Sequence, residues 1–388
     1  MILSVIAMLQ AVAAPAPQAA SVPEDKTIVV VGRRLSDTER ALAACIARKC
    51  PPREDIDASL AHAENQFLTG DYAESRRTLL AARRRNAKYA KDLPVDVSDL
   101  LRANARLAGL NGAATAARIN TIDTLDALKS GLPADDPRVL MQRLSVGDAF
   151  AKQARFEAAE DIYNRVARQA RAAGLPQVEG HALLRNAVLF TAIAGVNPAF
   201  RDRARKAIAR VQATTDPAQA GFRDAAVTLS SRAASGVSDE KAQAAARADM
   251  ATVAPAARAT TAVLIHAPPI DLGERGASAQ TVMAMQGDDA PQWVDVAFWV
   301  APDGSVRDID IVRQSANAGG GWIGKVKESL AGRVYRPLAL AASDPGLRRI
   351  ERYSLVYDVL AVLGSRIPSR ESVPHIEITD LTVDTAAG

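Results

Sequence analysis

The chain has 388 residues, of which 48% are hydrophobic and only 4% aromatic, and its formal net charge at pH 7 is +4. This length suits two or three domains, each able to bury its own core. Charges of both signs are interspersed, and the one dense basic run, Arg83 to Lys88, lacks interleaved aromatic residues. The composition therefore argues against a nucleic-acid partner, and the abundance of alanine favours helices over most of the length.

The N-terminal segment is almost wholly apolar from residue 2 to residue 14, and Ala11-Val12-Ala13 fits a small-x-small cleavage pattern. The run is shorter than the ~20 apolar residues that a transmembrane helix needs. We interpret residues 1–20 as a signal peptide, which predicts an exported protein. No Lys or Arg precedes the apolar run, so an uncleaved anchor or a wrongly assigned start remains the alternative. Residues 21–35 are expected to be extended.

The only cysteines are Cys45 and Cys50. In one straight helix five residues rise ~7.5 Å, whereas the Cα atoms of a disulfide must lie within ~7 Å of each other. Pro51 and Pro52 bias Cys50 away from helical geometry, so the chain is able to turn there. We therefore predict a local disulfide, which export would preserve. Two separate thiols, one of them buried, are the alternative.

Residues 36–255 are predicted to be helical, and two stretches within them superpose without gaps. Residues 56–87 show a helical apolar spacing that breaks at Gly70 and resumes at Tyr72. Residues 144–175 repeat this pattern, with Ala154 and Phe156 at the matching positions. Each stretch therefore predicts a helical hairpin, with its turn at Gly70 or Ala154.

The pattern of a small turn residue, an aromatic residue and then a small residue resembles the tetratricopeptide repeat. Ser75 and Ala159 take the small position after Tyr72 and Phe156. The two aromatic residues are 84 positions apart (156 − 72), twice 42, which predicts further turns near Ala114 and Pro198. The resemblance implies three or four hairpins in an array that presents a concave surface to a partner. An unrelated helical bundle is the alternative.

From residue 262 the apolar period changes from 3.6 to 2. Apolar residues alternate from Val294 to Val300, which predicts a half-buried strand. A turn follows at Asp303-Gly304, and a returning strand is predicted from Val306 to Val312. A helix is expected from Trp322 to Leu330, and a final strand from Arg349 to Val359. The predicted fold is mainly α, followed by a small α+β module of order β-β-α-β.

This module, over residues 262–362, resembles the C-terminal domain of TonB. The motif that carries the resemblance comprises Asp303, Gly304, Tyr335, Arg336 and Pro337. Energy-transducing members of that family have an N-terminal membrane anchor and a Pro-rich span, whereas this chain has an apparent signal peptide and helices. The resemblance therefore implies peptide binding in the periplasm and puts energy coupling in doubt. Residues 363–388 are expected to form a loose tail. A short strand at Ile376 and Ile378, which alternate briefly, is the alternative.

The final strand is the predicted peptide-binding edge, because an edge strand offers unpaired backbone groups to an extended peptide. The predicted contact residues are Ile350, Arg352, Tyr353, Leu355 and Tyr357. The alternative is that the chain's own tail covers this edge. Residues 25–32 resemble the TonB box of outer-membrane transporters, and we expect this segment to pair with a TonB-like domain in cis or in another molecule. A chance match to an ordinary short strand is the alternative.

Signals for enzymatic chemistry are missing from the sequence. The four histidines are scattered, and no nucleophile elbow, Walker loop or dinucleotide fingerprint appears. Asp308 and Asp310 are interpreted as exposed strand acids, with a weak Ca²⁺ site as the alternative. We therefore predict a non-enzymatic periplasmic scaffold with no cofactor, metal or small-molecule substrate, whose partner is a protein or peptide, such as an outer-membrane transporter. The alternatives are a membrane-anchored accessory energy transducer, an envelope enzyme with an unrecognised site, and a purely structural protein.

Overall fold

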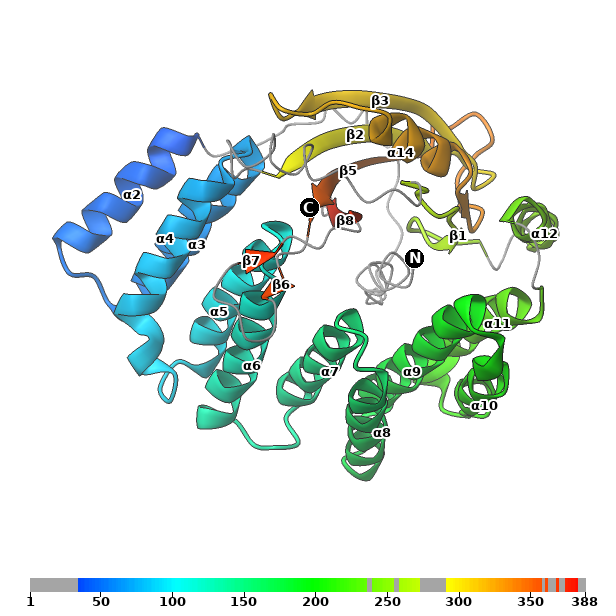
Figure 1. The fold of residues 1–388 in the computed structure, drawn as a ribbon, viewed down its shortest axis with the longest axis horizontal. Coiled ribbons are helices and arrows are strands. Elements are labelled where there is room, and N and C mark those ends of the chain that lie inside the picture. Colours follow the sequence, from blue (N-terminus) through cyan, green and yellow to red (C-terminus); the bar gives the residue numbers. More distant parts are fainter. Residues whose placement is uncertain are drawn as a thin grey trace. The chain divides into compact units, whose positions relative to one another are not determined.

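The computed structural model describes residues 34–235, 239–254, 258–272, 291–357, 360–361, 368–369 and 374–382. It is mainly helical and ends in a small antiparallel sheet, as the sequence predicted (Figure 1). The described residues divide into two compact units, one from residues 34–109 and 115–146, the other from residues 110–114 and from residue 147 onward. The predicted signal peptide and the TonB-box-like residues 25–32 lie outside the described residues.

Within the described residues, the first six helices are α2 (Leu35–Ala47), α3 (Pro52–Thr69), α4 (Tyr72–Asn86), α5 (Pro94–Leu110), α6 (Ala114–Gly131) and α7 (Pro137–Lys152), with the short 3-10 helix η2 (Ala87–Tyr89) after α4. Helices α3 and α4 form the first predicted hairpin. Tyr72 is buried at the start of α4, and the Ser75 hydroxyl donates to the carbonyl oxygen of Ala63 on α3 at 2.8 Å. The small residue at position 75 thus lies where the two helices approach each other.

Three turns between helices have the same backbone conformation. Gly70, Gly112 and Ala154 each have a left-handed backbone, with φ of 90°, 71° and 57°, and successive members are 42 residues apart. The first and third turns share a hydrogen bond at matching positions, from Asp71 N to Gln66 O and from Arg155 N to Phe150 O. A fourth break separates α9 from α10 around Pro198.

The following helices are α8 (Phe156–Ala172), α9 (Pro176–Val196), α10 (Arg201–Gln212), α11 (Ala220–Ser235) and α12 (Asp239–Ala251), with the 3-10 helices η3 (Pro198–Phe200) and η4 (Pro217–Gln219). Two glycines allow close packing. A Cβ on Gly147 would lie 2.5 Å from the ring of Tyr163, and one on Gly180 would lie 2.3 Å from the ring of Phe222. Among the described residues, none of these helices combines the length and the hydropathy needed to cross a bilayer.

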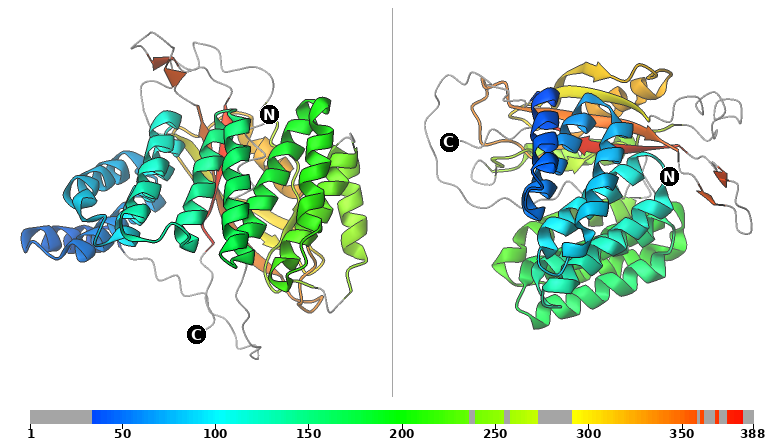
Figure 2. Two further views of the ribbon diagram at one scale, coloured as in Figure 1. Left: turned by 90° about the horizontal axis from the view of Figure 1, so that it is seen from below. Right: turned by 90° about the vertical axis from the view of Figure 1, so that its left-hand side faces the viewer.

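The C-terminal module contains β1 (Leu264–His266), β2 (Gln292–Val300), β3 (Val306–Gln314), α14 (Trp322–Ala331), β4 (Val334–Tyr335), β5 (Leu347–Val356) and β8 (His375–Asp380). Four strands form an antiparallel sheet in the order β3-β2-β5-β8, and β1 pairs with β4. One face of the sheet packs on α14 through Val294, Val296, Phe298 and Val300. A separate two-stranded ladder joins β6 (Leu360–Ala361) and β7 (Pro368–Ser369) (Figure 2).

Two features of this module differ from the main expectation. The segment expected to be a loose tail contributes β8, at the short strand that Ile376 and Ile378 left open. Strand β8 pairs with β5 from Glu351↔Asp380 to Val356↔His375, so the sheet extends past residue 362. The strand expected to be half-buried is buried on both faces, because Trp293, Asp295 and Ala297 are also excluded from solvent. The alternation of polar residues along β2 therefore does not mark a solvated face.

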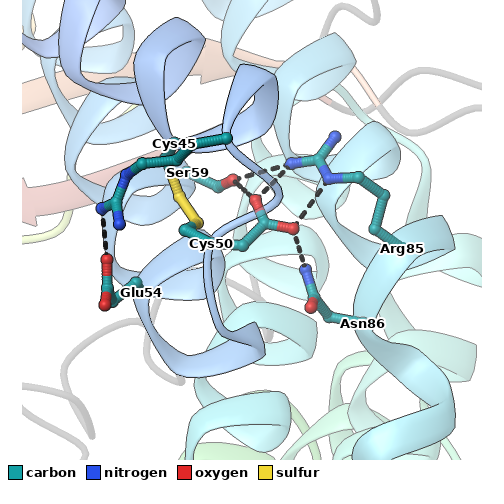
Figure 3. Close-up of a disulfide and its surroundings, with 8 residues drawn as sticks. Cys45, Cys50, Glu54, Ser59, Arg85 and Asn86 are labelled. Atoms are coloured by element: carbon teal, nitrogen blue, oxygen red, sulfur yellow. Dashed lines mark hydrogen bonds and ion pairs between the residues drawn. A yellow bond between two sulfur atoms is a disulfide. The ribbon is translucent and has the colours of Figure 1, made fainter.

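The predicted disulfide is present between Cys45 and Cys50, whose Cα atoms lie 5.1 Å apart. Helix α2 ends at Ala47, Lys49 takes a left-handed backbone with φ of 52°, and α3 begins at Pro52. The turn that Pro51 and Pro52 impose is what brings the two sulfur atoms together (Figure 3).

Candidate functional site: the edges of the C-terminal sheet

The predicted binding strand, β5, is not an edge of the sheet. Strand β2 pairs along one side of it and β8 along the other. The backbone N–H and C=O groups that an added peptide would need are therefore already used by β8. The expectation of an open β5 edge is wrong, and the alternative, in which the chain's own tail covers it, is what the structure shows.

The five predicted contact residues lie along β5 and just beyond it. Arg352, Tyr353 and Leu355 are buried, whereas Ile350 and Tyr357 are half-buried. Burial alone raises the pKa of the Tyr357 hydroxyl above its ordinary value. Three of the five side chains thus belong to the interior of the module.

Arg352 belongs to a buried ion pair. Its Nε and Nη2 donate to the two carboxylate oxygens of Asp295 at 2.6 and 2.9 Å, and its guanidinium lies 3.9 Å from the centre of the Trp293 ring. Arg313 of β3 approaches the same carboxylate at 2.7 Å. Asp295 therefore holds side chains from two neighbouring strands, β3 and β5, on the sheet face opposite α14.

Tyr353 belongs to a second buried network, on the α14 face. Arg333 donates to both oxygens of Glu351, at 3.0 and 2.9 Å, and to the hydroxyls of Tyr335 and Tyr353. Burial and the Glu351 carboxylate raise the pKa of Tyr353 well above its ordinary value. Burial opposes the charge of Arg333, but Tyr353 and Glu351 raise its pKa overall, so the guanidinium stays charged. This network joins β4 to β5 and uses the hydroxyl of Tyr353, a residue predicted to contact a peptide.

The motif residues that are far apart in sequence meet at one end of the sheet. The backbone N–H of Tyr335 donates to the carbonyl oxygen of Gly304 at 2.9 Å, and Leu338 N donates to Pro302 O at 2.9 Å. Gly304 has φ of 83°, and a Cβ there would lie 2.1 Å from the carbonyl oxygen of Tyr335. The Asp303 carboxylate accepts from Ser305 and Arg307 and so fixes the turn.

Beyond Tyr335, the chain anchors the same corner. Arg336 N donates to Val263 O at 2.9 Å, and the Arg336 side chain lies 3.5 Å from Asp224 of α11. Pro337 accepts at its carbonyl oxygen from Ala259 N at 2.8 Å. The contacts of all five motif residues are thus with other parts of the module or with α11, and they explain the motif as a structural junction.

Strand β3 is the long edge of the sheet. It spans nine residues, and among the described strands it pairs with β2 alone. Ile311 and Val312 are 36% and 44% exposed on it. Its register with β2 shifts at two places, and Asp308 takes φ of 50° at one of them. The strand therefore offers an accessible edge with an irregular outline.

Strand β8 is the opposite edge and is more closely held. Glu377 accepts from Lys152 of α7 at 2.7 Å, and His375 Nε2 lies 3.6 Å from the same carboxylate oxygen. Arg349 pairs with Asp380, and Ile376 packs into the apolar core. These contacts make β8 the less accessible of the two edges.

A surface cavity of about 480 Å³ lies among α8, α9, α10 and η4. Its two arginines are engaged within the protein: Arg171 donates to Glu179 at 2.8 Å, and Arg210 donates to Asn164 at 2.7 Å. Within the described part of the chain, no group of histidine, cysteine and acidic residues is placed to hold a metal ion. The cavity is thus a weaker candidate site than the sheet edge.

Sequence reasoning did not identify either strand as an edge. It described β3 only as a returning strand, although its charged residues Arg307, Asp308, Asp310 and Arg313 are typical of a guarded edge strand. The signal for β8 was the alternation of Ile376 and Ile378, which was noted only as an open possibility. No family model matches the sequence, and the search of curated proteins gave no significant match.

Proposed function

We propose that this chain is an exported, non-enzymatic scaffold whose C-terminal sheet binds an extended peptide by strand addition at β3. The helical hairpins are proposed to be of tetratricopeptide type, and the C-terminal module to be of the TonB C-terminal type. The observation that carries the proposal is the position of β3, a nine-residue strand paired on one side and exposed at Ile311 and Val312.

Strand addition needs backbone groups that no neighbouring strand uses, and the outer side of β3 pairs with no other described strand. The bulges and charges of β3 discourage indiscriminate pairing, because a flat strand from another chain would not match its outline. A cognate peptide has to follow the bend near Asp308 and to tolerate the exposed acids at 308 and 310. The same features thus favour a selective partner.

Two further observations support the other parts of the proposal. The left-handed turns at Gly70, Gly112 and Ala154 recur every 42 residues, which favours hairpins of a single repeating type. The disulfide between Cys45 and Cys50 favours an oxidising compartment, such as the periplasm. The partner class that the TonB-like resemblance implies is an outer-membrane transporter or another protein with an extended segment.

The test uses a synthetic peptide of residues 25–32 as the probe and hydrogen exchange of the full chain as the measurement. We expect the backbone amides of residues 306–314 to become protected when the peptide is added. The matched control is the same peptide with Val30→Pro, because proline has no N–H to donate and does not fit an added strand. The Ile311→Lys, Val312→Lys variant is expected to weaken protection at least tenfold.

Unchanged exchange at β3, or equal protection by both peptides, would exclude this segment as the ligand. A photoreactive residue at Ile311 then tests other partners in intact envelopes, with Val227 of α11, an exposed valine outside the sheet, as the control position. Crosslinks from position 311 to an extended segment of an envelope protein would support strand addition. The same products from both positions, or none at 311, would contradict it.

A further inference from the structure

Helix α2 contributes little to the apolar core. Of its thirteen residues only Thr38 and Cys45 are buried, and Leu35 and Ile46 remain 38% and 46% exposed. A helix of this length is marginal in water unless it packs against a neighbour. The position of α2 on α3 therefore depends on few buried side chains of α2.

Polar and covalent contacts hold α2 at two places. Thr38 Oγ1 lies 3.1 Å from His62 Nδ1 and accepts from Asn65 Nδ2 at 3.2 Å, both on α3. At the other end, Cys50 N donates to Cys45 O at 3.0 Å, the disulfide joins the two side chains, and Arg48 pairs with Glu54 (Figure 3). The disulfide is the one covalent restraint among these contacts.

The hairpin beneath α2 is held together independently. The Asp55 carboxylate of α3 accepts from Arg85 Nε and Nη2 at 2.8 and 2.6 Å and from Asn86 Nδ2 at 2.7 Å, both on α4. Ser59 also donates to Asp55 at 3.1 Å. Figure 3 shows Ser59, Arg85 and Asn86 grouped beside the disulfide without taking part in it. These contacts need neither cysteine.

We propose that the Cys45–Cys50 disulfide holds α2 against α3, and that its reduction releases α2 and leaves the α3–α4 hairpin folded. Cys45 is 3% exposed and Cys50 is half-buried, so an external thiolate reaches the sulfur of Cys50 more readily. Attack there forms a mixed disulfide and releases the Cys45 thiolate, which takes up a proton. The second thiol of a dithiol reductant then resolves the mixed disulfide, leaving two protein thiols and one oxidised dithiol.

Release has a defined consequence for the surface. Leu35 and Ile46 are already exposed while α2 is docked, so release changes mainly the side chains that face α3. Thr38 of α2 and His62 of α3 are 5% and 7% exposed and contact each other, and both become accessible when α2 leaves. The oxidation state of one disulfide thus decides whether these two side chains are covered.

The test compares hydrogen exchange in the oxidised and the dithiothreitol-reduced full chain. We expect amides of residues 38–47 to exchange at least tenfold faster after reduction, while amides of residues 56–86 keep their protection. The Cys45→Ser, Cys50→Ser variant, folded without any disulfide, should match the reduced protein. The matched control is Asp55→Asn, which should speed exchange in α3 and α4 while the disulfide remains intact.

Two results would overturn the proposal. Full protection of α2 after complete reduction, verified by thiol labelling, would mean that Thr38, His62 and Asn65 hold α2 alone. Equal loss of protection in α2, α3 and α4 would mean that the disulfide supports the whole hairpin. If the serine variant does not fold, reduction of the folded wild-type protein still separates these outcomes.

Discussion

Two carboxylate–arginine pairs, one in the sheet and one in the first hairpin, show how differently the two regions are stabilised. The side chains of Asp295 and Arg352 are both 0% exposed, whereas that of Arg85 is 34% exposed beside Asp55. In addition to Arg352, Asp295 contacts a second arginine, Arg313. In addition to Arg85, Asp55 accepts hydrogen bonds from the neutral side chains of Ser59 and Asn86. The sheet thus depends on charges removed from water, and the hairpin on a pair that water still reaches.

The comparison shows where a single substitution is most damaging. Removing one partner of a fully buried pair leaves a charge without compensation in an apolar environment, which costs about 3–5 kcal/mol. A pair that is partly exposed loses less, because water solvates the charge that is left. The C-terminal sheet is therefore more sensitive than the first hairpin to the loss of a charge.

The largest expected effect is that of Asp295→Leu, because it takes the carboxylate away from the fully buried Arg352 guanidinium. The free energy of unfolding of the sheet module should fall by about 3–5 kcal/mol, and the double variant Asp295→Leu, Arg352→Met should regain most of it. All three tryptophans, at positions 293, 299 and 322, lie in this module, so tryptophan fluorescence in urea reports on it. The matched variant Asp55→Leu leaves the partly exposed Arg85 and should cost about 1–2 kcal/mol, measured by circular dichroism at 222 nm. Equal losses in the two variants would break the comparison.

A smaller effect is expected at Glu377, whose side chain is 15% exposed and so lies between Arg352 and Arg85 in burial. Burial alone would raise the pKa of this carboxyl, but the hydrogen bond from His375 and the charge of Lys152 lower it to about 2. The folded pKa thus lies below the ordinary value of 4.5, so the stabilisation is present above pH 4.5 and is lost as the pH falls towards 2. The pKa difference of about 2.5 (4.5 − 2) corresponds to about 3 kcal/mol.

The measurement is the difference in unfolding free energy between the wild-type protein and Glu377→Gln across this window. At pH 6 the variant should be less stable, and by pH 2 the two proteins should converge. Parallel curves at both pH values would show that the carboxylate of Glu377 does not depend on His375 and Lys152. The comparison with Arg352 would then hold for fully buried pairs only.

The smallest expected effect concerns the two matching turns. Ala154 holds the left-handed conformation that Gly70 adopts without strain, so Ala154→Gly should raise the free energy of unfolding by about 0.5–1 kcal/mol and Gly70→Ala should lower it by about 1 kcal/mol. Thermal unfolding followed at 222 nm gives both values. Ala158→Gly, inside α8, is the control and should lower stability by about 1 kcal/mol. Changes of the same sign at positions 70 and 154 would contradict equivalent turns.

Helix boundaries and turns could be predicted because their signals are local. Gly70, Gly112 and Ala154 each interrupt a helical pattern within a few residues, and Pro51 and Pro52 next to Cys50 sufficed to predict the disulfide turn. The order of β2, β3, α14 and β5 followed from the change in period for the same reason.

Strand neighbours could not be predicted, because pairing depends on segments that are far apart. The alternating pattern of its own strand predicts a solvated side chain for Asp295, because its partner Arg352 lies 57 residues away in the sequence. The same distance effect led to the wrong edge: β5 has an alternating pattern, but only the pairing with β8 decides which of its backbone groups are open. The candidate binding edge was therefore the least predictable part of the molecule.

The contact between Gly304 and Tyr335 also bears on how the module folds. A Pro-Asp-Gly turn looks like a local nucleus that closes the β2–β3 hairpin early, but here its geometry is completed by a backbone group 31 positions later (335 − 304). Loop-closure entropy has to be overcome before that contact forms. We expect the turn to tighten only when β4 docks, so that the transition state for folding contains both ends of the module and an isolated β2–β3 peptide stays unstructured.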